Sequence, residues 1–439
     1  MNLKLSEMKR ISLLTGFLIS SLFLSNCRNE NTTLVLSSPS DAGMKPQKVQ
    51  LIDGHIQSYI DADKVPGGVF LIARKGIVVY YKSFGESKEG VPYKNDDIFR
   101  IASMTKAITT VGIMQLYEQG KLGLDDPVSI FIPAFSNQEV LDRFNEADSS
   151  YTTVPVNRPV TIRHLLTHTS GIAYGGFNPG KIMAVYEKFG MNDVGLSHPS
   201  WTTEEFINRL AEVPLVFQPG NRFLYGLNMD VLGRIIEVVS GMPLDQYFSE
   251  NIFKPLGMED TYFYLPEEKH GRLVPVYSQT DSGYQLIEGD DAELVKYPFR
   301  SGISHFAGGG GLSSTAMDYA RFIQALVNDG LYGDYQLLSR KTIEVMASDQ
   351  LIRLNKKGAG ISNIPGITFG LGFQVYTEDA KGVNSKSVGT FEWGGYFNTK
   401  FFIDPEEDLI FVGMTQIVPF YNNDFWDRMY AMIYGAIND

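Results

Sequence analysis

The sequence of 439 residues has one cysteine, Cys27, and carries fewer basic than acidic residues. A single cysteine excludes an intrachain disulfide and a thiolate-based metal site. The 38 Lys and Arg residues stand against 50 Asp and Glu residues, which gives a net charge of −12. Because an acidic chain repels phosphate backbones, no nucleic-acid partner is expected.

Long apolar runs are also missing, apart from residues 11–24, which follow a basic N-terminal stretch. That run is short for a bilayer crossing, and its layout is typical of a secretory signal peptide over residues 1–26. A cysteine directly after it resembles a bacterial lipobox, although Asn26 replaces the usual small residue. We expect an exported cell-envelope lipoprotein, anchored in the membrane through a lipid on Cys27. The alternative is ordinary cleavage nearby, which would give a periplasmic or extracellular protein.

Hydrophobic periodicity indicates how the rest of the chain is organised. Residues 28–43 are polar and show no period, which predicts a tether. Residues 44–61 have the spacing of an amphipathic helix, and residues 68–73 and 77–81 that of a β-hairpin covered on both faces. Strand patterns return near the C-terminus, and a final helix is predicted: residues 370–376, 387–393, 399–403, 409–415 and 425–437.

The order of these segments predicts a fold of the α/β (α+β) class in residues 44–437. Strand patterns at both ends indicate an antiparallel sheet built from about 44–100 and 340–437 and flanked by helices. A mostly helical region, about 101–339, is inserted between them. Within it, residues 137–159 and 177–198 are polar and predict loops near a site.

Ser103 and Lys106 form an S-x-x-K element at the start of a helix predicted over residues 102–120. Residues three apart lie on one helical face, so the lysine amine can reach the serine hydroxyl. A lysine removed from water can accept that proton and activate a weak nucleophile. The helix N-terminus adds backbone N–H groups that favour a developing oxyanion.

Other short motifs follow Ser103 in a fixed order. They include the segment that ends in His168-Thr169-Ser170-Gly171, then Tyr225, then residues 308–311, and finally Trp393-Gly394-Gly395. Together they resemble the serine β-lactamase-related superfamily, which includes class C β-lactamases, D,D-peptidases and family VIII carboxylesterases. The resemblance covers about residues 44–437. It implies the β-lactamase/transpeptidase-like fold and a serine hydrolase that needs no metal or organic cofactor.

The resemblance also implies a role for each matching residue. Ser103 is the expected acylated nucleophile, Lys106 its base or proton relay, and Tyr225 a proton shuttle between the nucleophile and the leaving group. Trp393, Gly394 and Gly395 occupy the substrate-binding strand edge, and the amides of Ser103 and Tyr396 form the expected oxyanion hole.

Two departures from the superfamily pattern favour an esterase. The element beginning at Tyr225 usually reads Tyr-x-Asn, but Asn228 stands one place late, which on a helix turns the side chain by about 100°. Trp393 replaces the usual cation that holds a β-lactam carboxylate, and its apolar face suits an acyl or alkoxy group. We therefore predict hydrolysis of small acyl esters by way of an acyl-enzyme. The alternatives are a β-lactamase or D,D-peptidase acting on β-lactams or cell-wall amides, and a non-catalytic cell-envelope binding protein.

Two further patterns receive a structural interpretation. His164 and His168 are four apart, a spacing that can bind metal, but no acidic third ligand is obvious nearby. The glycines at 308–311 lack the Gly-Lys-Ser/Thr ending of a phosphate-binding loop and predict a tight turn near the pocket.

Overall fold

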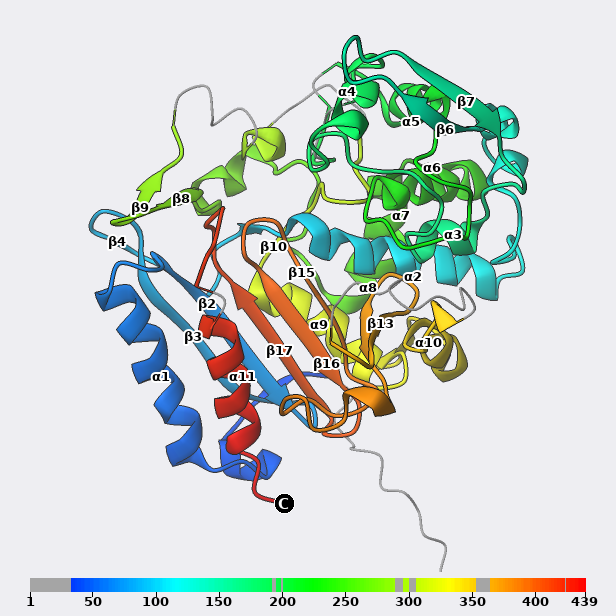
Figure 1. Cartoon of the computed structure of the whole chain (residues 1–439). Helices are drawn as coiled ribbons and strands as arrows, with labels where there is room; N and C mark the ends of the chain where they lie inside the picture. The colour runs from blue at the N-terminus through cyan, green and yellow to red at the C-terminus, as the bar shows by residue number, and fades with distance from the viewer. Residues whose placement is uncertain are drawn as a thin grey trace, which may run out of the picture. The chain divides into compact units, whose positions relative to one another are not determined.

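A sheet of nine strands forms the centre of the computed structural model, which describes residues 33–191, 195–198, 200–288, 295–299, 305–352, 364–422 and 424–439. The strand order is β1–β3–β2–β17–β16–β15–β14–β13, with β4 beside β3 (Figure 1). The strands of this sheet are β1 (Val35–Leu36), β2 (Gly67–Arg74), β3 (Ile77–Lys88), β4 (Val91–Pro92), β13 (Ile367–Phe369), β14 (Gln374–Tyr376), β15 (Phe391–Gly394), β16 (Lys400–Asp404) and β17 (Leu409–Met414).

The two ends of the chain meet in the middle of this sheet. β17 pairs antiparallel with β2 along its whole length, with Val412 opposite Leu71. Every residue of β2 and of β17 is buried, as expected for strands covered on both faces. A sheet made from N- and C-terminal segments was predicted from the apolar runs, and the structure shows it.

Helices cover both faces of the sheet. α1 and α11 pack on one face, where their apolar side chains share a core with Phe70, Phe402 and Phe411, and α9 crosses the other face (Figure 1). The helices are α1 (Pro46–Asp61), α2 (Thr105–Glu118), α3 (Ile162–Leu166), α4 (Lys181–Glu187), α5 (Thr203–Glu212), α6 (Asn228–Ser240), α7 (Leu244–Phe248), α8 (Lys254–Leu256), α9 (Ala316–Val327), α10 (Arg340–Met346) and α11 (Asp424–Gly435). Within the described residues, no helix combines the length and apolarity that a bilayer crossing requires.

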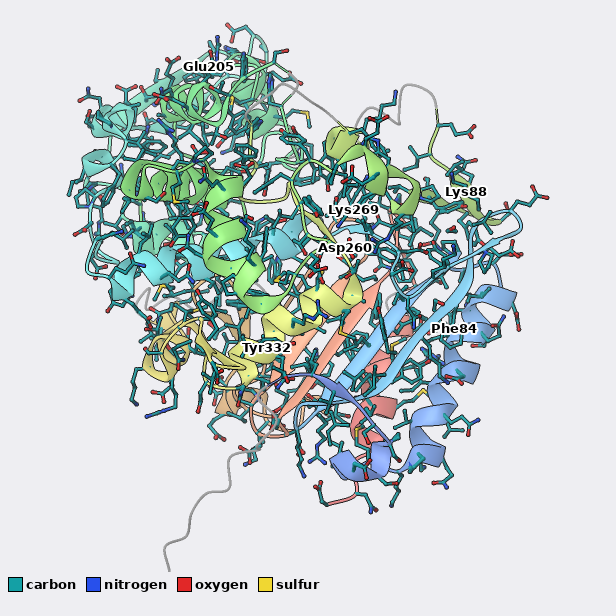
Figure 2. All side chains as sticks on the ribbon, turned by 180° about the vertical axis from the view of Figure 1, so that it is seen from behind. Phe84, Lys88, Glu205, Asp260, Lys269 and Tyr332 are labelled. Atoms are coloured by element: carbon teal, nitrogen blue, oxygen red, sulfur yellow. The ribbon has the colours of Figure 1, made fainter. Side chains whose placement is uncertain are left out.

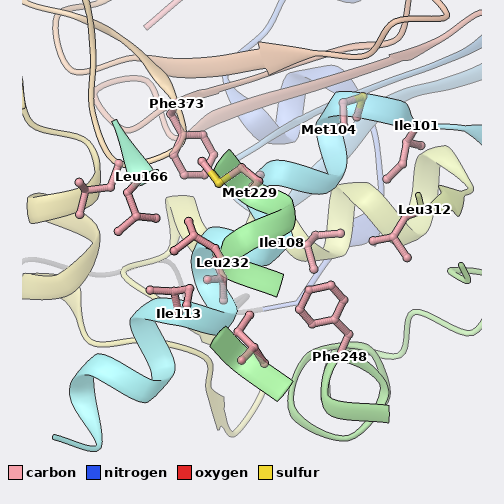
Figure 3. Close-up of a cluster of buried hydrophobic side chains, with 14 of the residues drawn as sticks. Ile101, Met104, Ile108, Ile113, Leu166, Met229, Leu232, Phe248, Leu312 and Phe373 are labelled. Atoms are coloured by element: carbon pink, nitrogen blue, oxygen red, sulfur yellow. The ribbon is translucent and has the colours of Figure 1, made fainter. Parts of the chain in front are cut away.

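Helix α2 is buried on all sides. Every residue from Thr105 to Leu116 is inaccessible to solvent or nearly so. Figure 3 shows Ile108 and Ile113 of this helix among Leu232 and Phe248, which come from α6 and α7. A helix packed this tightly cannot move easily, so the residues at its N-terminus have a fixed position.

Short paired strands and ion pairs hold segments outside the main sheet. The small sheets are β5 (Phe99–Arg100) with β10 (Ser313–Ser314), β6 (Glu139–Phe144) with β7 (Tyr151–Pro155), β8 (Tyr277–Thr280) with β9 (Gly283–Leu286), and β11 (Leu331–Tyr332) with β12 (Tyr335–Gln336). On the side of the molecule shown in Figure 2, Asp260 accepts hydrogen bonds from Lys269 at 2.7 Å and Arg272 at 2.8 Å.

The structure corrects the sequence predictions for the tether, for the direction of the strands and for two loops. Residues 33–43 are not a tether, because Val35 and Leu36 pair with β3 and the carbonyl of Ala42 accepts a hydrogen bond from Arg74. That β1–β3 pair is parallel, so the sheet is mixed rather than wholly antiparallel. The loop predicted over 137–159 contains the β6–β7 hairpin, and the loop predicted over 177–198 contains α4. The signal peptide and Cys27 lie outside the described residues.

Candidate active site

Ser103 lies in a short 3-10 turn, Ala102–Met104, directly before α2. The prediction of a helix from residue 102 is therefore wrong by one turn. The preceding residue, Ala102, has a φ of 41°, a left-handed conformation that costs energy for any residue with a Cβ. The close approach of Gly395 to this turn contributes to the constraint, since a Cβ on Gly395 would lie 2.4 Å from the carbonyl oxygen of Ile101.

The amine of Lys106 is buried and makes three polar contacts. Its Nζ lies 3.1 Å from Ser103 Oγ, 3.0 Å from the Tyr174 hydroxyl and 2.6 Å from the Gly309 carbonyl oxygen. The predicted meeting of Ser103 and Lys106 is thus present in the structure. A neutral amine can donate to the tyrosine and carbonyl oxygens and turn its lone pair toward the serine hydroxyl. The arrangement suits a base for Ser103.

Tyr174 and Gly309 were not identified from the sequence as contacts of Lys106. They lie 68 and 203 residues away from it along the chain. The glycine run at 308–311 forms the predicted turn beside the pocket, and Gly308 is anchored by a bond from Thr109 Oγ1 to its carbonyl at 2.7 Å. The sequence offers one signal that Tyr174 belongs to the site, its place just after Ser170-Gly171. That signal alone does not distinguish Tyr174 from the other tyrosines among the 23 in the chain.

Tyr225 faces the same site from the segment before α6. The Lys106 amine lies 4.7 Å from the centre of its ring, and Trp393 Nε1 donates a hydrogen bond to its hydroxyl oxygen at 3.3 Å. The indole N–H can only donate, so the Tyr225 oxygen accepts this bond and its own hydrogen stays free to be passed on. Both contacts suit a group that passes a proton back and forth.

Tyr225 is held by His168 through both of its neighbours in the chain. The amide of Leu224 donates to the His168 carbonyl at 2.8 Å, and the amide of Gly226 points at His168 Nδ1 at 3.4 Å. The imidazole itself lies 4.7 Å from the Tyr225 ring, centre to centre. Burial, helped by the charge of Lys106, holds the pKa of His168 well below its usual range, so the ring is neutral.

Asn228 contacts His168 and Ser170, which lie behind Tyr225, and not the catalytic side chains. Its side-chain nitrogen lies 2.8 Å from His168 Nδ1, and its side-chain oxygen accepts a hydrogen bond from Ser170 Oγ at 2.5 Å. As predicted, Asn228 does not replace the missing motif asparagine. The reason given for this prediction, a helix that contains both residues, was wrong, because Tyr225 precedes α6.

His164 has a separate structural role at the start of α3. Its Nδ1 accepts from the Thr161 amide at 3.2 Å in a capping box. Burial and the nearby charge of Arg158 lower the pKa of His164 to about 4. In the part of the chain that the structure describes, no group of three or more His, Cys, Asp or Glu side chains is placed to hold a metal ion.

The third motif lies on β15 at the edge of the site. Trp393, Gly394, Gly395 and Tyr396 all line one cavity with Ser103 and Tyr225, and its volume is about 880 Å³. The Trp393 ring packs on Phe369 and Tyr225, so its apolar face forms a wall of this cavity. Phe177 and Tyr396, with ring centres 5.5 Å apart, line the same cavity. Burial raises the pKa of Tyr396 above its usual value, so its phenol stays neutral.

The two residues whose amides are predicted to form the oxyanion hole belong to different segments of the chain. Ser103 and Tyr396 both line the cavity, one from the turn before α2 and the other from the turn after β15. The structure brings these two residues to one cavity, and the role of their amides as an oxyanion hole stays a prediction.

The site can be compared with known proteins. A family model described as Beta-lactamase matches residues 52–432. Esterase EstB of Burkholderia gladioli is 31% identical to the chain over a segment that covers 78% of this chain and 83% of EstB. Lovastatin esterase of Penicillium rubens is 31% identical, with 84% of this chain and 92% of that enzyme covered.

Solved structures give the same classification. EstCE1, a hydrolase with promiscuous acyltransferase activity, is similar with a TM-score of 0.74 and 27% identity, covering 88% of this chain and 98% of that one. These similarities confirm the fold class and the class of enzyme that the sequence motifs predicted.

Proposed function

Since the chain belongs to the beta-lactamase family, we propose that it hydrolyses esters of small acyl groups through an acyl-enzyme on Ser103. The chain is a serine hydrolase of this family, and its relatives include esterases and acyltransferases. The reaction type, the substrate and the roles of single residues are our proposal. The geometry around Lys106 and Tyr225 supports them.

In the proposed acylation step, Lys106 Nζ takes the proton of Ser103 Oγ as the oxygen attacks the ester carbonyl carbon. The carbonyl oxygen becomes an anion and is held by the amides of Ser103 and Tyr396. The carbon–alkoxy bond then breaks, and the leaving oxygen takes a proton delivered through the Tyr225 hydroxyl from Lys106.

In the deacylation step, a water molecule attacks the acyl carbon and gives its proton to the Tyr225–Lys106 pair. The bond to Ser103 Oγ breaks, and the serine oxygen recovers a proton from the same pair. The products are a carboxylic acid and an alcohol, and the three side chains return to their starting state.

The observation that carries the choice of an ester is the position of Trp393. Its ring forms an apolar wall beside Ser103, and its N–H is already used by the Tyr225 hydroxyl. An indole provides no cation for a β-lactam carboxylate at this point, whereas an acyl or alkoxy chain packs well against it.

Turnover of two substrates by the parent protein and by Ser103→Ala tests the proposal. We expect p-nitrophenyl butyrate to be hydrolysed by the parent protein and not by the variant, with little turnover of a chromogenic cephalosporin. Fast cephalosporin turnover would show that the β-lactamase alternative is right. If neither substrate is turned over by a folded parent protein, the esterase proposal fails.

We also propose that the protein is exported and anchored in the cell envelope by a lipid on Cys27. The support is the sequence alone: an apolar run that ends just before the only cysteine. In a bacterial host, membranes from cells that produce the parent protein should retain it, and Cys27→Ala should release it. Equal retention of the two would overturn the lipid anchor.

A further inference from the structure

The cavity that contains Ser103 has a second, charged end. It continues along β15 past Gly394, and side chains of the loop before β15, of β15 itself, of β16 and of α11 line it there: Lys386, Glu392, Lys400 and Asp427. β14 pairs with Phe391 and Glu392 but not with the next two residues of β15. The edge of β15 is thus unpaired with β14 at Trp393 and Gly394, and the cavity passes over it.

Lys400 lies across this passage. It is the cross-strand partner of Gly394, and side chains on neighbouring strands at paired positions share a face. A Cβ on Gly394 would lie 2.9 Å from Lys400 Cδ and 3.1 Å from its Nζ. The amine is therefore held directly over Gly394, and any larger residue at 394 would displace it.

The other buried charges of this end neutralise one another. The Glu392 carboxylate forms an ion pair with Lys386 and accepts hydrogen bonds from Gln374 at 2.7 Å and Tyr376 at 3.0 Å. The Lys386 amine also lies 4.3 Å from the centre of the Tyr430 ring. The charges of Glu392 and Lys386 are therefore balanced within the protein and are not available to a ligand.

The Lys400 amine, in contrast, makes no hydrogen bond or ion pair within 4.0 Å to any side chain of the described residues. Burial lowers the pKa of Lys400, while the more distant carboxylates of Glu392 and Asp427 oppose that effect. Asp427 is exposed on α11. A partly buried cation without a bound partner is costly, and an incoming anion would remove that cost.

We propose that Lys400 binds a carboxylate of the substrate, so that the enzyme prefers esters with an acid group at the far end of the acyl chain. This proposal rests on the proposed esterase function. The amide of Tyr396, where the ester carbonyl is expected, lies two residues beyond Gly394, in the turn that follows β15. Because the side chains of Trp393 and Lys400 lie on opposite faces of the sheet, an acyl chain from Ser103 reaches Lys400 by passing over the unpaired edge of β15 beside Trp393.

A pair of matched esters tests the proposal: the mono-p-nitrophenyl ester of adipic acid and its methyl ester, which differ by one negative charge. We expect the parent protein to show a higher kcat/KM for the acid. The net charge of −12 repels anions and works against this preference. In Lys400→Met we expect the ratio of acid to methyl ester to fall roughly tenfold, the scale of one charge-assisted contact. Lys400→Arg should retain most of the ratio.

Two other variants control the test. Lys381 is exposed and does not line the cavity, so Lys381→Met should leave the ratio unchanged while making the same change in net charge. Asp427→Asn removes a carboxylate that interacts with Lys400 and should raise the ratio. An unchanged ratio in Lys400→Met would overturn the proposal. If thermal unfolding shows that Lys400→Met does not fold, an unchanged ratio in Asp427→Asn would overturn the proposal instead.

Failure of this inference differs from failure of the proposed function. If the methyl ester is hydrolysed in a Ser103-dependent way with no preference for the acid, only the role of Lys400 is wrong. If neither ester is hydrolysed, or if turnover survives Ser103→Ala, the esterase proposal itself fails.

Discussion

At the residue scale, the hydrogen bond between Trp393 and Tyr225 links the specificity of the site to its proton transfer. The same side chain forms an apolar wall of the cavity and donates its only N–H to the Tyr225 oxygen at 3.3 Å. A lysine at this position could hold a substrate anion but could not provide the apolar wall. The two properties can be separated by removing the N–H while keeping an aromatic ring.

Trp393→Phe makes this separation. We expect kcat for p-nitrophenyl butyrate to fall by about two- to tenfold, the range expected for one net hydrogen bond, with KM changed much less. Steady-state kinetics of the variant measures both. Trp201→Phe, at a tryptophan outside the cavity, is the matched control and should leave both constants unchanged. An unaltered kcat in Trp393→Phe would contradict the role of the indole N–H.

At the element scale, the site depends on how the segment around Tyr225 fits against the segment that follows His168. The two are close enough that Gly226 must be a glycine: a Cβ there would lie 2.1 Å from the carbonyl oxygen of Ile172. Because the obstacle is backbone, no side-chain rotation relieves the contact. The position of Tyr225 is therefore set by packing of loop on loop, before α6 begins.

Gly226→Ala should consequently move Tyr225. We expect kcat to fall at least tenfold and the free energy of unfolding to fall by roughly 1–3 kcal/mol, the usual cost of overpacking. Gly54→Ala is the matched control, since Gly54 lies in the middle of α1 and a Cβ added there would have no other atom within 4 Å. That control should stabilise the protein by roughly 0.5–1 kcal/mol. Urea unfolding and ester kinetics measure both effects, and wild-type activity in Gly226→Ala would show that the two segments are not tightly fitted.

The elements also show what the sequence can predict. Apolar runs identified β2, the first part of β3, β16, β17, α1 and α11, because buried strands and amphipathic helices carry a periodic signal. The β6–β7 hairpin was missed because most of its side chains are exposed, so its strands lack that signal. Ser103, Lys106, Tyr225 and Trp393 were found by motif order. Tyr174 and Gly309 were not, because their contacts with Lys106 exist only once distant segments are folded together.

At the scale of the whole molecule, buried neutral histidines couple stability to pH. His168 is fully buried with its pKa well below 6.5, so below that pH the unfolded chain binds a proton at this residue that the folded chain does not bind. Stability contributed by such a group is present at high pH and is lost as the pH falls. Asp318, whose pKa burial raises to about 6, has the opposite sign, because the folded state binds its proton first.

His168→Asn removes one of these contributions and keeps a residue type that tolerates the left-handed backbone found there, with φ of 52°. The variant should be less stable at neutral pH, since it loses packing against Tyr225. Between about pH 6 and pH 5, however, its free energy of unfolding should fall less steeply than that of the parent, by about 1.4 kcal/mol per pH unit. Urea unfolding at a series of pH values gives both slopes, and equal slopes would mean that His168 is protonated in the folded state.

Covalent labelling of the intact protein with a fluorophosphonate shows whether Ser103 is the acylated nucleophile. Trypsin releases Ser103 in the peptide of residues 101–106, which lies between Arg100 and the cleavage site after Lys106. Mass spectrometry should find one label per chain, located on Ser103 of that peptide, and no label on Ser103→Ala. A label on another residue, or equal labelling of the two proteins, would contradict the account.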